Sequence, residues 1–597
     1  MGTGKSSAMK LRSRNEIRRV AAAALILVAA GVLAYSNSFR GAFVFDDIRA
    51  IVNNPHIRQV LPLSRSLSGP WDSAVRDRPV VSFTLALNYA LGGLEPRGYH
   101  LFNLAVHLLA GLTLFGIFRR TFENSRFSPA FNRSATGLGF AAALIWLLHP
   151  LQTESVTYVI QRSESLAGLF YLLTLYSFIR AAGSRHRPAW YGSSVIFCGL
   201  GMGTKAMMIT APVTVFLYDA VFISGSPAGA LKKRWPLYSA LAATWLIQLL
   251  IVLHTSYDDL KGLSALAYLV TQPSVLTHFL RLTIWPHPLC LDYGWPLAGS
   301  IRDILPGAVV IGGLLWLTVY GLLKKPALGF AGAWFFLILA PTSSLLPLED
   351  PAFEHRMYLP LAAIAALAVG AVFSLLQRIF SPALRRPAAV VVLAAATLLL
   401  GTLTYRRNRD YHDPLELWRE ITILRPEHAR GYYNYGLELG KSGRRDEAIE
   451  QYREAILLKP DYAHAYNNLA SDLAEKGELL EAVRHYGQAI RIKPGYWEAR
   501  YNLGTALSQL GRNREALASF QEALRLQPGF APAYFQAGET LRKLGRHREA
   551  AAYYRKAIEL NPAFISAIRE RAAEAEQTGD REISREYQEI LKHPSAR

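Results

Sequence analysis

The chain reads VAAAALILVAAGVLAYSNSFRGAFVFDDIRAIVNNP from Val20 to Pro55. Its first part, Val20 to Phe39, has the length that an apolar helix needs to cross a bilayer, about 20 residues. Two adjacent carboxylates, Asp46 and Asp47, follow shortly after this run. Because charged side chains are costly at a membrane boundary, they usually mark function there. We therefore expect a membrane protein with a polar site beside its first span.

The composition indicates a membrane part joined to a soluble part. The 597 residues are 51% hydrophobic, with a mean hydropathy of +0.14, yet the last third is visibly polar. A net charge of +20 would suggest nucleic acid if the basic residues formed one stripe. They lie instead in short gaps between apolar runs, so we expect no nucleic-acid partner. The two cysteines, Cys198 and Cys290, imply no disulfide framework.

Apolar runs predict a bundle of about 11 membrane spans. The predicted ranges are 20–39, 99–118, 135–150, 164–181, 190–204, 206–223, 236–254, 306–323, 328–346, 357–377 and 388–404. Clusters of Lys and Arg in alternate gaps place the N-terminal tail, residues 1–19, in the cytoplasm. The apolar piece 265–285 must then be interfacial or re-entrant, and the cluster of Arg406, Arg407 and Arg409 lies on the outer side against the rule.

The predicted outer loops hold most of the unusual polar residues. Besides the Asp pair, they carry Arg78, His149, Glu154, Arg162, Lys205, Asp292, Glu354 and Arg356. The cytoplasmic gaps carry bulk positive charge instead. This asymmetry indicates a polar site on the outer face.

From about residue 413 the chain contains an internal repeat of 34 residues. The recurring positions include Pro426, Pro460, Pro494, Pro528 and Pro562, together with Gly443, Gly477, Gly511, Gly545 and Gly579. Small residues and an aromatic residue keep the same period, as in tetratricopeptide repeats. We predict a connector with a first helix at 405–428, four repeats at 429–564 and capping helices at 565–597, after a membrane domain at 20–404. The fold class is all-α.

Four amide side chains share one position of the repeat, on the helix that lines the concave groove. They are Asn434, Asn468, Asn502 and Gln536. Amides can bind the backbone of an extended peptide with little regard to its sequence. The array locally resembles the repeats of the O-linked N-acetylglucosamine transferase, which carry such ladders. The alternative is that these residues only solvate an exposed face.

The order of the motifs resembles a known family over nearly the whole chain. The motifs are Asp46-Asp47, Arg78-Pro79, Leu87 to Gly93, Tyr99 to Asn103, His149-Pro150 with Glu154, Lys205, Tyr218-Asp219, Asp292-Tyr293, Glu354 and Arg356 to Pro360, followed by the repeats. This order is similar to that of the transmembrane and tetratricopeptide protein O-mannosyltransferases and their bacterial relatives, of the GT-C glycosyltransferase superfamily. His355 departs from the Glu-Arg adjacency expected in relatives.

The resemblance implies a transferase that takes a sugar, mannose or a similar hexose, from a polyprenyl-phosphate carrier on the outer or lumenal face. One residue of the Asp46-Asp47 pair would be the general base, and Asp47 is the preferred one. Cations would stabilise the lipid phosphate that leaves: Arg78, Lys205, Arg356 and Arg162. Positioning of the sugar or the loops would fall to His149, Glu154, Asp292 and Glu354. We expect no bound cofactor beyond the lipid-linked donor, and the need for a metal stays open.

Several alternatives remain at this point. Lys205 could be an interfacial anchor, His149-Pro150 could merely end a helix, and Asp292 could cap a turn. The acceptor could be a lipid-linked glycan or a surface polysaccharide instead of a protein held by the repeats. A non-catalytic, membrane-anchored repeat scaffold is a third reading. The preferred location is a bacterial inner membrane with periplasmic repeats, or the endoplasmic reticulum membrane in a eukaryote.

Overall fold

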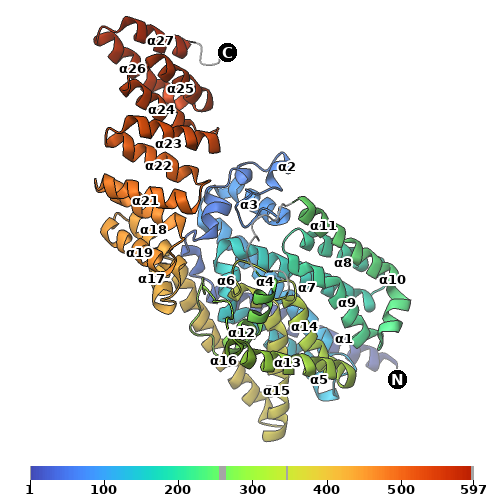
Figure 1. The fold of residues 1–597 in the computed structure, drawn as a ribbon. Helices are drawn as coiled ribbons and strands as arrows, with labels where there is room; N and C mark the ends of the chain where they lie inside the picture. Colours follow the sequence, from blue (N-terminus) through green and yellow to red (C-terminus); the bar gives the residue numbers. More distant parts are fainter. Residues whose placement is uncertain (1, 255–263, 345–346, 593–597) are drawn as a thin grey trace. The chain divides into compact units, whose positions relative to one another are not determined.

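The computed structural model describes residues 2–254, 264–344 and 347–592, and every regular element in these ranges is a helix (Figure 1). The all-α prediction is therefore confirmed. The chain divides into two compact units, Met1–Leu417 and Trp418–Arg597. The division falls inside the predicted connector, 405–428, within helix α17 (Pro414–Leu424).

Eight segments of the described residues are helical, long and apolar enough to cross a membrane. They are Asn15–Arg40, Pro96–Phe122, Val159–Ala182, Ala206–Ile223, Pro227–His254, Ile301–Lys324, Pro360–Ile379 and Arg385–Tyr411. A ninth is possible if α5 (Pro129–Leu148) and the segment Pro150–Thr157, which are bent by 58° at His149, form one broken span. The first unit is thus a multi-pass membrane bundle.

The prediction of about 11 spans exceeds the eight, or at most nine, segments of the described residues that are long and apolar enough to cross a membrane. The predicted spans 190–204 and 328–346 correspond to α8 (Arg187–Met202) and α14 (Pro326–Leu339), which have 16 and 14 residues. Both are shorter than the eight candidate spans. Helix α12 (Ala265–Ile284), expected to be interfacial or re-entrant, is not among the candidate spans either.

The core of the membrane unit lies around α4 (Pro96–Phe122), which packs against α5 and α7 (Arg162–Ala182). Trp146 of α5 donates its indole N–H to the carbonyl of Tyr358 at 2.7 Å. The Tyr358 hydroxyl is 2.9 Å from Nδ1 of His107 in α4. These buried bonds fix the short helix η9 (Glu354–Met357) at the start of α15 (Pro360–Ile379) against α4 and α5.

The loop after the first span is held by the end of α16 (Arg385–Asn408). Asn408 donates its side-chain amide to the carbonyl of Ala34 at 3.0 Å, and it accepts from Thr157 at 2.7 Å. The backbone N–H of Ala42 donates to the carbonyl of Tyr411 at 3.0 Å. The segment with the Asp pair therefore starts from a fixed point, although it lies in a loop.

The second unit contains four helix pairs, α18/α19 to α24/α25, followed by α26 (Ile565–Gln577) and α27 (Arg581–Lys592) (Figure 1). The pairs are Ala429–Lys441 with Arg445–Leu458, Ala463–Glu475 with Leu479–Ile492, Trp497–Gln509 with Asn513–Leu526, and Ala531–Lys543 with His547–Leu560. The recurring glycine, Gly443 in the first pair, ends the first helix with a positive φ of 79°. Only glycine adopts this conformation without strain, which explains its period.

Candidate functional site

Asp47 is buried and serves as an anchor for the loop that carries the pair. Its carboxylate accepts hydrogen bonds from the backbone N–H groups of Val44 at 3.1 Å and Ile160 at 2.7 Å. Burial raises the pKa of Asp47 to about 8, although these two donors act in the opposite direction. Phe45, between these bonds, has a φ of +49°. A non-glycine residue in this region costs about 1–3 kcal/mol and persists only where the surroundings hold it.

Asp46 differs from its neighbour because it is only half-buried. Its backbone N–H donates to the hydroxyl of Tyr158 at 2.9 Å, so the main chain is fixed at this residue. Asp47 has 0% exposure, whereas the Asp46 side chain has access to solvent. Of the two residues, Asp46 is therefore the more accessible one.

One short segment, Tyr158 to Glu164, contacts the Asp pair and two of the candidate cations, Arg78 and Lys205. Its Tyr158 and Ile160 hold the Asp pair, as described above. Ser163 accepts a hydrogen bond from Nη1 of Arg78 at 3.2 Å. Glu164 forms an ion pair with Nζ of Lys205 at 2.5 Å. We call residues 158–164 the hub segment.

Arg78 and Lys205 are the two candidate cations that keep some exposure. Arg78 directly precedes α3 (Pro79–Gly92), and 21% of its side chain is exposed. Lys205 lies between α8 and η6 (Ala206–Thr210), with 12% of its side chain exposed. Burial lowers the pKa of Lys205, and the positive charge of Arg78 lowers it further. The two cations are therefore near each other and near the hub segment.

Arg162 and Arg356 are instead buried and bonded mostly to the main chain. Arg162 donates to Oδ1 of Asn88 at 2.6 Å and to the carbonyl of Tyr99 at 3.2 Å. Arg356 donates to the carbonyls of Asp350 and Pro351, both at 2.6 Å. Because these donors already have protein partners, the geometry gives both arginines a role in holding loops together.

Glu154 and Glu354 belong to a buried network beneath the exposed groups. Glu154 accepts from the backbone N–H of His355 at 2.8 Å and from its Nδ1 at 2.7 Å. Burial and the nearby cations lower the pKa of His355 well below its usual value, and burial raises the pKa of Glu154. His355, which separates Glu354 from Arg356, is thus a hydrogen-bond partner of Glu154.

Glu354 binds the loop that contains Asp292. Its Oε1 accepts from the backbone N–H of Cys290 at 2.5 Å and from the hydroxyl of Tyr293 at 2.7 Å. Arg407 lies 3.8 Å from Oε2. Burial raises the pKa of Glu354, and the charge of Arg407 opposes this rise. Asp292 itself is fully buried next to these residues, with Oδ1 3.4 Å from the N–H of Gly294.

His149 is placed where a helix ends. Its Nδ1 accepts from the N–H of Leu151 at 3.2 Å, and its Nε2 lies 3.2 Å from the carbonyl of Thr283. Both ring nitrogens therefore have main-chain partners at the bend between α5 and η4 (Pro150–Gln152). This geometry agrees with the alternative that His149 ends a helix.

The amides of the repeat groove form part of a chain of side-chain hydrogen bonds. Asn502 donates to Asn467 at 3.2 Å, Asn467 donates to Asn468 at 3.1 Å, and Asn468 donates to the hydroxyl of Tyr433 at 3.3 Å. Asn468, Asn502 and Gln536 are half-buried, whereas Asn434 is buried. The repeat position thus brings Asn468 and Asn502 together through Asn467, which the sequence pattern did not single out.

The structure places at the site four residues for which the sequence pattern predicts no role. They are Tyr158, Ser163, Glu164 and Arg407. Polar residues at the start of an apolar helix were the only available signal for Ser163 and Glu164. Within residues 2–254, 264–344 and 347–592, no three His, Cys, Asp or Glu side chains are grouped as metal ligands would be.

Comparison with known proteins gives similarities for both units. The family described as dolichyl-phosphate-mannose-protein mannosyltransferase matches residues 76–253, and tetratricopeptide repeat families match 436–471, 470–511 and 501–563. The first match includes Arg78, Arg162 and Lys205. The repeat matches agree with the predicted array.

Curated relatives carry the name of one activity. The chain is 32% identical over 238 residues to protein O-mannosyl-transferase TMTC1 of Homo sapiens, which covers 36% of this chain and 26% of that protein. It is 26% identical over 489 residues to protein O-mannosyl-transferase TMTC4 of Mus musculus, covering 72% of this chain and 65% of that protein. The chain thus spans less than two thirds of either relative. Among solved structures, the crystal structure of MamA aligns at 24% identity with a TM-score of 0.24, covering 25% of this chain and 87% of that one.

Proposed function

Because the chain belongs to the family of protein O-mannosyltransferases that carry tetratricopeptide repeats, we propose that it transfers a hexose, mannose or a close analogue, to a protein hydroxyl. The donor is a polyprenyl-phosphate sugar, and transfer takes place at the outer or lumenal face. The observation that supports this function most directly is the hub segment. It contacts the Asp pair, Arg78 and Lys205 within seven residues of chain, 158–164.

Asp46 is the general base in this proposal. A base must be ionised when the acceptor binds, and its oxygens must be within hydrogen-bond reach of the hydroxyl. Asp47 meets neither condition well, because its pKa is raised to about 8 and both its oxygens accept from backbone N–H groups. The initial preference for Asp47 therefore changes to Asp46, with Asp47 as the residue that positions it.

The reaction is a displacement at the anomeric carbon. The acceptor oxygen forms a bond to this carbon, the bond from the carbon to the phosphate oxygen breaks, and the hydroxyl proton passes to Asp46. Negative charge grows on the departing lipid phosphate. Arg78 and Lys205 are the cations left with exposure to meet it, and preorganised charges of this kind are usually the largest catalytic contribution.

The repeats bind the acceptor as an extended segment. The half-buried amides of Asn468 and Asn502 are held in position by the hydrogen-bond chain through Asn467. Fixed amides can donate to and accept from a peptide backbone while ignoring its side chains. Arrays of this type present an extended concave surface that suits such a ligand.

Glycopeptide mass spectrometry tests the proposal. The full chain and its Asp46→Asn variant are expressed in a host that lacks the activity, and hexosylated Ser and Thr are quantified. We expect hexose on protein in the wild type and none in Asp46→Asn. An exposed carboxylate of the same outer loop, Asp72, provides the matched control as Asp72→Asn, which is expected to keep full transfer.

The acceptor is tested separately. If the repeats hold the protein acceptor, Asn468→Ala with Asn502→Ala lowers protein glycosylation while the rate of donor hydrolysis stays unchanged. If a lipid-linked glycan is the acceptor, the same double variant leaves transfer to the lipid fraction intact. Incubation with a polyprenyl-phosphate sugar and, in parallel, with a nucleotide sugar identifies the donor.

A further inference from the structure

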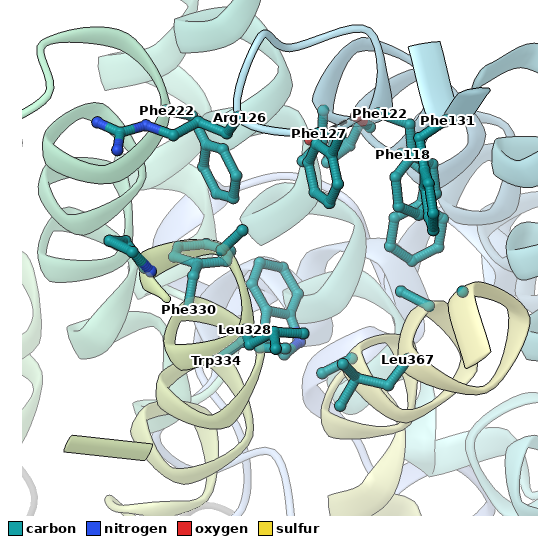
Figure 2. Close-up of a pocket in the computed structure, with 18 of the residues that line it drawn as sticks. Phe118, Phe122, Arg126, Phe127, Phe131, Phe222, Leu328, Phe330, Trp334 and Leu367 are labelled. Atoms are coloured by element: carbon teal, nitrogen blue, oxygen red, sulfur yellow. Dashed lines mark hydrogen bonds between the residues drawn. The ribbon is translucent and has the colours of Figure 1, made fainter. Parts of the chain in front are cut away.

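The membrane unit contains a large apolar cavity that the proposed reaction does not use. Its volume is about 800 Å³, within the range of about 300–1,000 Å³ that ligand pockets occupy. Figure 2 shows Phe118 and Phe127 facing Trp334 and Leu367 across it, while Phe222 packs edge-on against Phe330 with ring centroids 5.3 Å apart. The lining comes from α4, α5, η7 (Asp219–Ile223), α14 and α15. Such an interior suits a hydrocarbon chain.

The rim of this cavity is positively charged. Arg126, in the loop between α4 and α5, and Lys324 and Lys325, in the turn between α13 and α14, are exposed and line it. Among the described residues that line the cavity, none is acidic, and these three cations form no ion pair within the described chain. An apolar interior beneath a cationic rim is complementary to an anionic lipid.

The cationic rim of the cavity lies far from the hub segment. Helix α4 begins beside Arg162, which donates to the carbonyl of Tyr99, and ends with Phe122 at the cavity. The 23 residues between Tyr99 and Phe122 correspond to about 35 Å of helix, roughly the thickness of a bilayer core. Arg126 and the Lys324-Lys325 turn also belong to the gaps that the positive-inside rule places in the cytoplasm. The rim is therefore at the opposite membrane face from the Asp46 site, and the apolar interior extends from it as far as Ala362, in the first turn of α15.

We propose that this cavity binds an acyl chain of an anionic glycerophospholipid from the surrounding leaflet. The chain packs against the rings of α4, η7 and α14, and the phosphate contacts Arg126, Lys324 and Lys325. The polyprenyl-phosphate donor has the same chemistry, a phosphate on a hydrocarbon chain. We assign the site to the phospholipid because the cationic rim, which would hold the phosphate, is about a bilayer thickness away from the groups that would meet the donor phosphate.

Native mass spectrometry of the purified full chain tests this assignment. Retention is measured for phosphatidylglycerol, for phosphatidylcholine with the same acyl chains, and for a polyprenyl phosphate. Gly370→Leu fills the cavity, since a Cβ at Gly370 meets only the ring of Phe131, at 3.7 Å. Gly312→Leu, in α13, is the matched control, because nothing lies within 4 Å of its Cβ and it does not line the cavity.

Charge is tested with exposed residues. Arg126→Gln, Lys324→Gln and Lys325→Gln are combined, and Lys232→Gln with Lys233→Gln on α10 (Pro227–Ala243) is the control. We expect Gly370→Leu to abolish tight retention of phosphatidylglycerol. In the combined rim variant, we expect the preference of the protein for phosphatidylglycerol over phosphatidylcholine to fall by about fivefold for each charge removed. The controls are expected to match the wild type.

Two results would overturn the proposal. Unchanged phosphatidylglycerol retention in the rim variant, whose surface substitutions do not disturb the core, would exclude the phosphate contact even if Gly370→Leu fails to fold. Polyprenyl phosphate that binds more tightly than phosphatidylglycerol, and is lost in Gly370→Leu, would assign the cavity to the carrier. Neither result bears on transfer by the Asp46 site.

Discussion

Substitution of each member of the Asp pair by Asn separates the two roles that the geometry gives them. Asp46→Asn keeps the size of a half-buried side chain and removes its negative charge together with its capacity to take a proton. General-base catalysis contributes about 10²–10⁴-fold, so transfer should fall by this factor. The free energy of unfolding should change by no more than about 0.5 kcal/mol, as for other accessible positions.

Asp47→Asn acts on stability instead. The Asp47 carboxylate accepts from two buried backbone N–H groups, those of Val44 and Ile160. The side-chain amide of Asn has only one oxygen, so one of these two backbone N–H groups would face the NH2 group and lose its acceptor. This loss costs about 1–3 kcal/mol. It also weakens the contacts that hold Phe45 at positive φ, so we expect a lower melting temperature together with a partial loss of transfer.

The assay combines glycopeptide mass spectrometry with thermal unfolding of the purified full chain in lipid nanodiscs. Wild type and Asp72→Asn give the reference for both measurements. The assignment of Asp46 as the general base is refuted if Asp46→Asn transfers sugar at the wild-type rate. It is equally refuted if Asp47→Asn melts at the wild-type temperature and yet has no activity, since Asp47 would then be the base.

Three further predictions follow from individual contacts. Arg78→Ala should lower transfer about 10²-fold or more at unchanged stability. Arg162→Ala should instead reduce the amount of folded protein, because it leaves a buried amide and buried carbonyls without a donor. The yield of detergent-stable protein and the rate of transfer distinguish the two variants. Gly436→Ala should destabilise its repeat by about 1–3 kcal/mol, since the new Cβ would lie 2.8 Å from a ring carbon in α19. Gly487→Ala is the control and should leave stability unchanged, because nothing lies within 4 Å of its Cβ. Hydrogen exchange of the repeats measures both effects. Burial raises the pKa of Asp472 to about 6, so folding disfavours its ionised form. Asp472→Asn should therefore stabilise the repeats above pH 6, which is measured as slower hydrogen exchange. This gain in stability should be lost below about pH 4, where Asp472 is protonated in both the folded and the unfolded state.

Periodicity and apolar length were enough to predict most of the fold. The 34-residue period of proline and glycine gave the repeats because it follows from one packing unit and a turn that needs positive φ, as at Gly443. The span count was less secure, since apolar runs at α8 and α14 yield helices of only 16 and 14 residues. An apolar run shows that a segment is buried, in lipid or in protein, but not which of these surrounds it.

The site was only partly predictable, because the sequence shows which charges share a face but not what each one touches. Arg162 and Arg356 look like Arg78 in the sequence, and only the carbonyls beside them reveal that their donors already have partners. The same limit applies to Asn467, which joins the groove amides from the neighbouring repeat position. Candidate charges can therefore be predicted, but their division into binding and supporting residues requires the structure.

The arginines after the last span illustrate this point. Arg406, Arg407 and Arg409 contradicted the positive-inside rule if each is counted as a free cation. Arg407 is buried, 2.9 Å from Asp410 and 3.8 Å from Glu354. A cation paired with carboxylates adds little net charge to its membrane face, so it should carry little weight in setting the orientation. Arg407 therefore belongs to the buried network around Glu354, whereas Arg406 and Arg409 are exposed and still count against the rule.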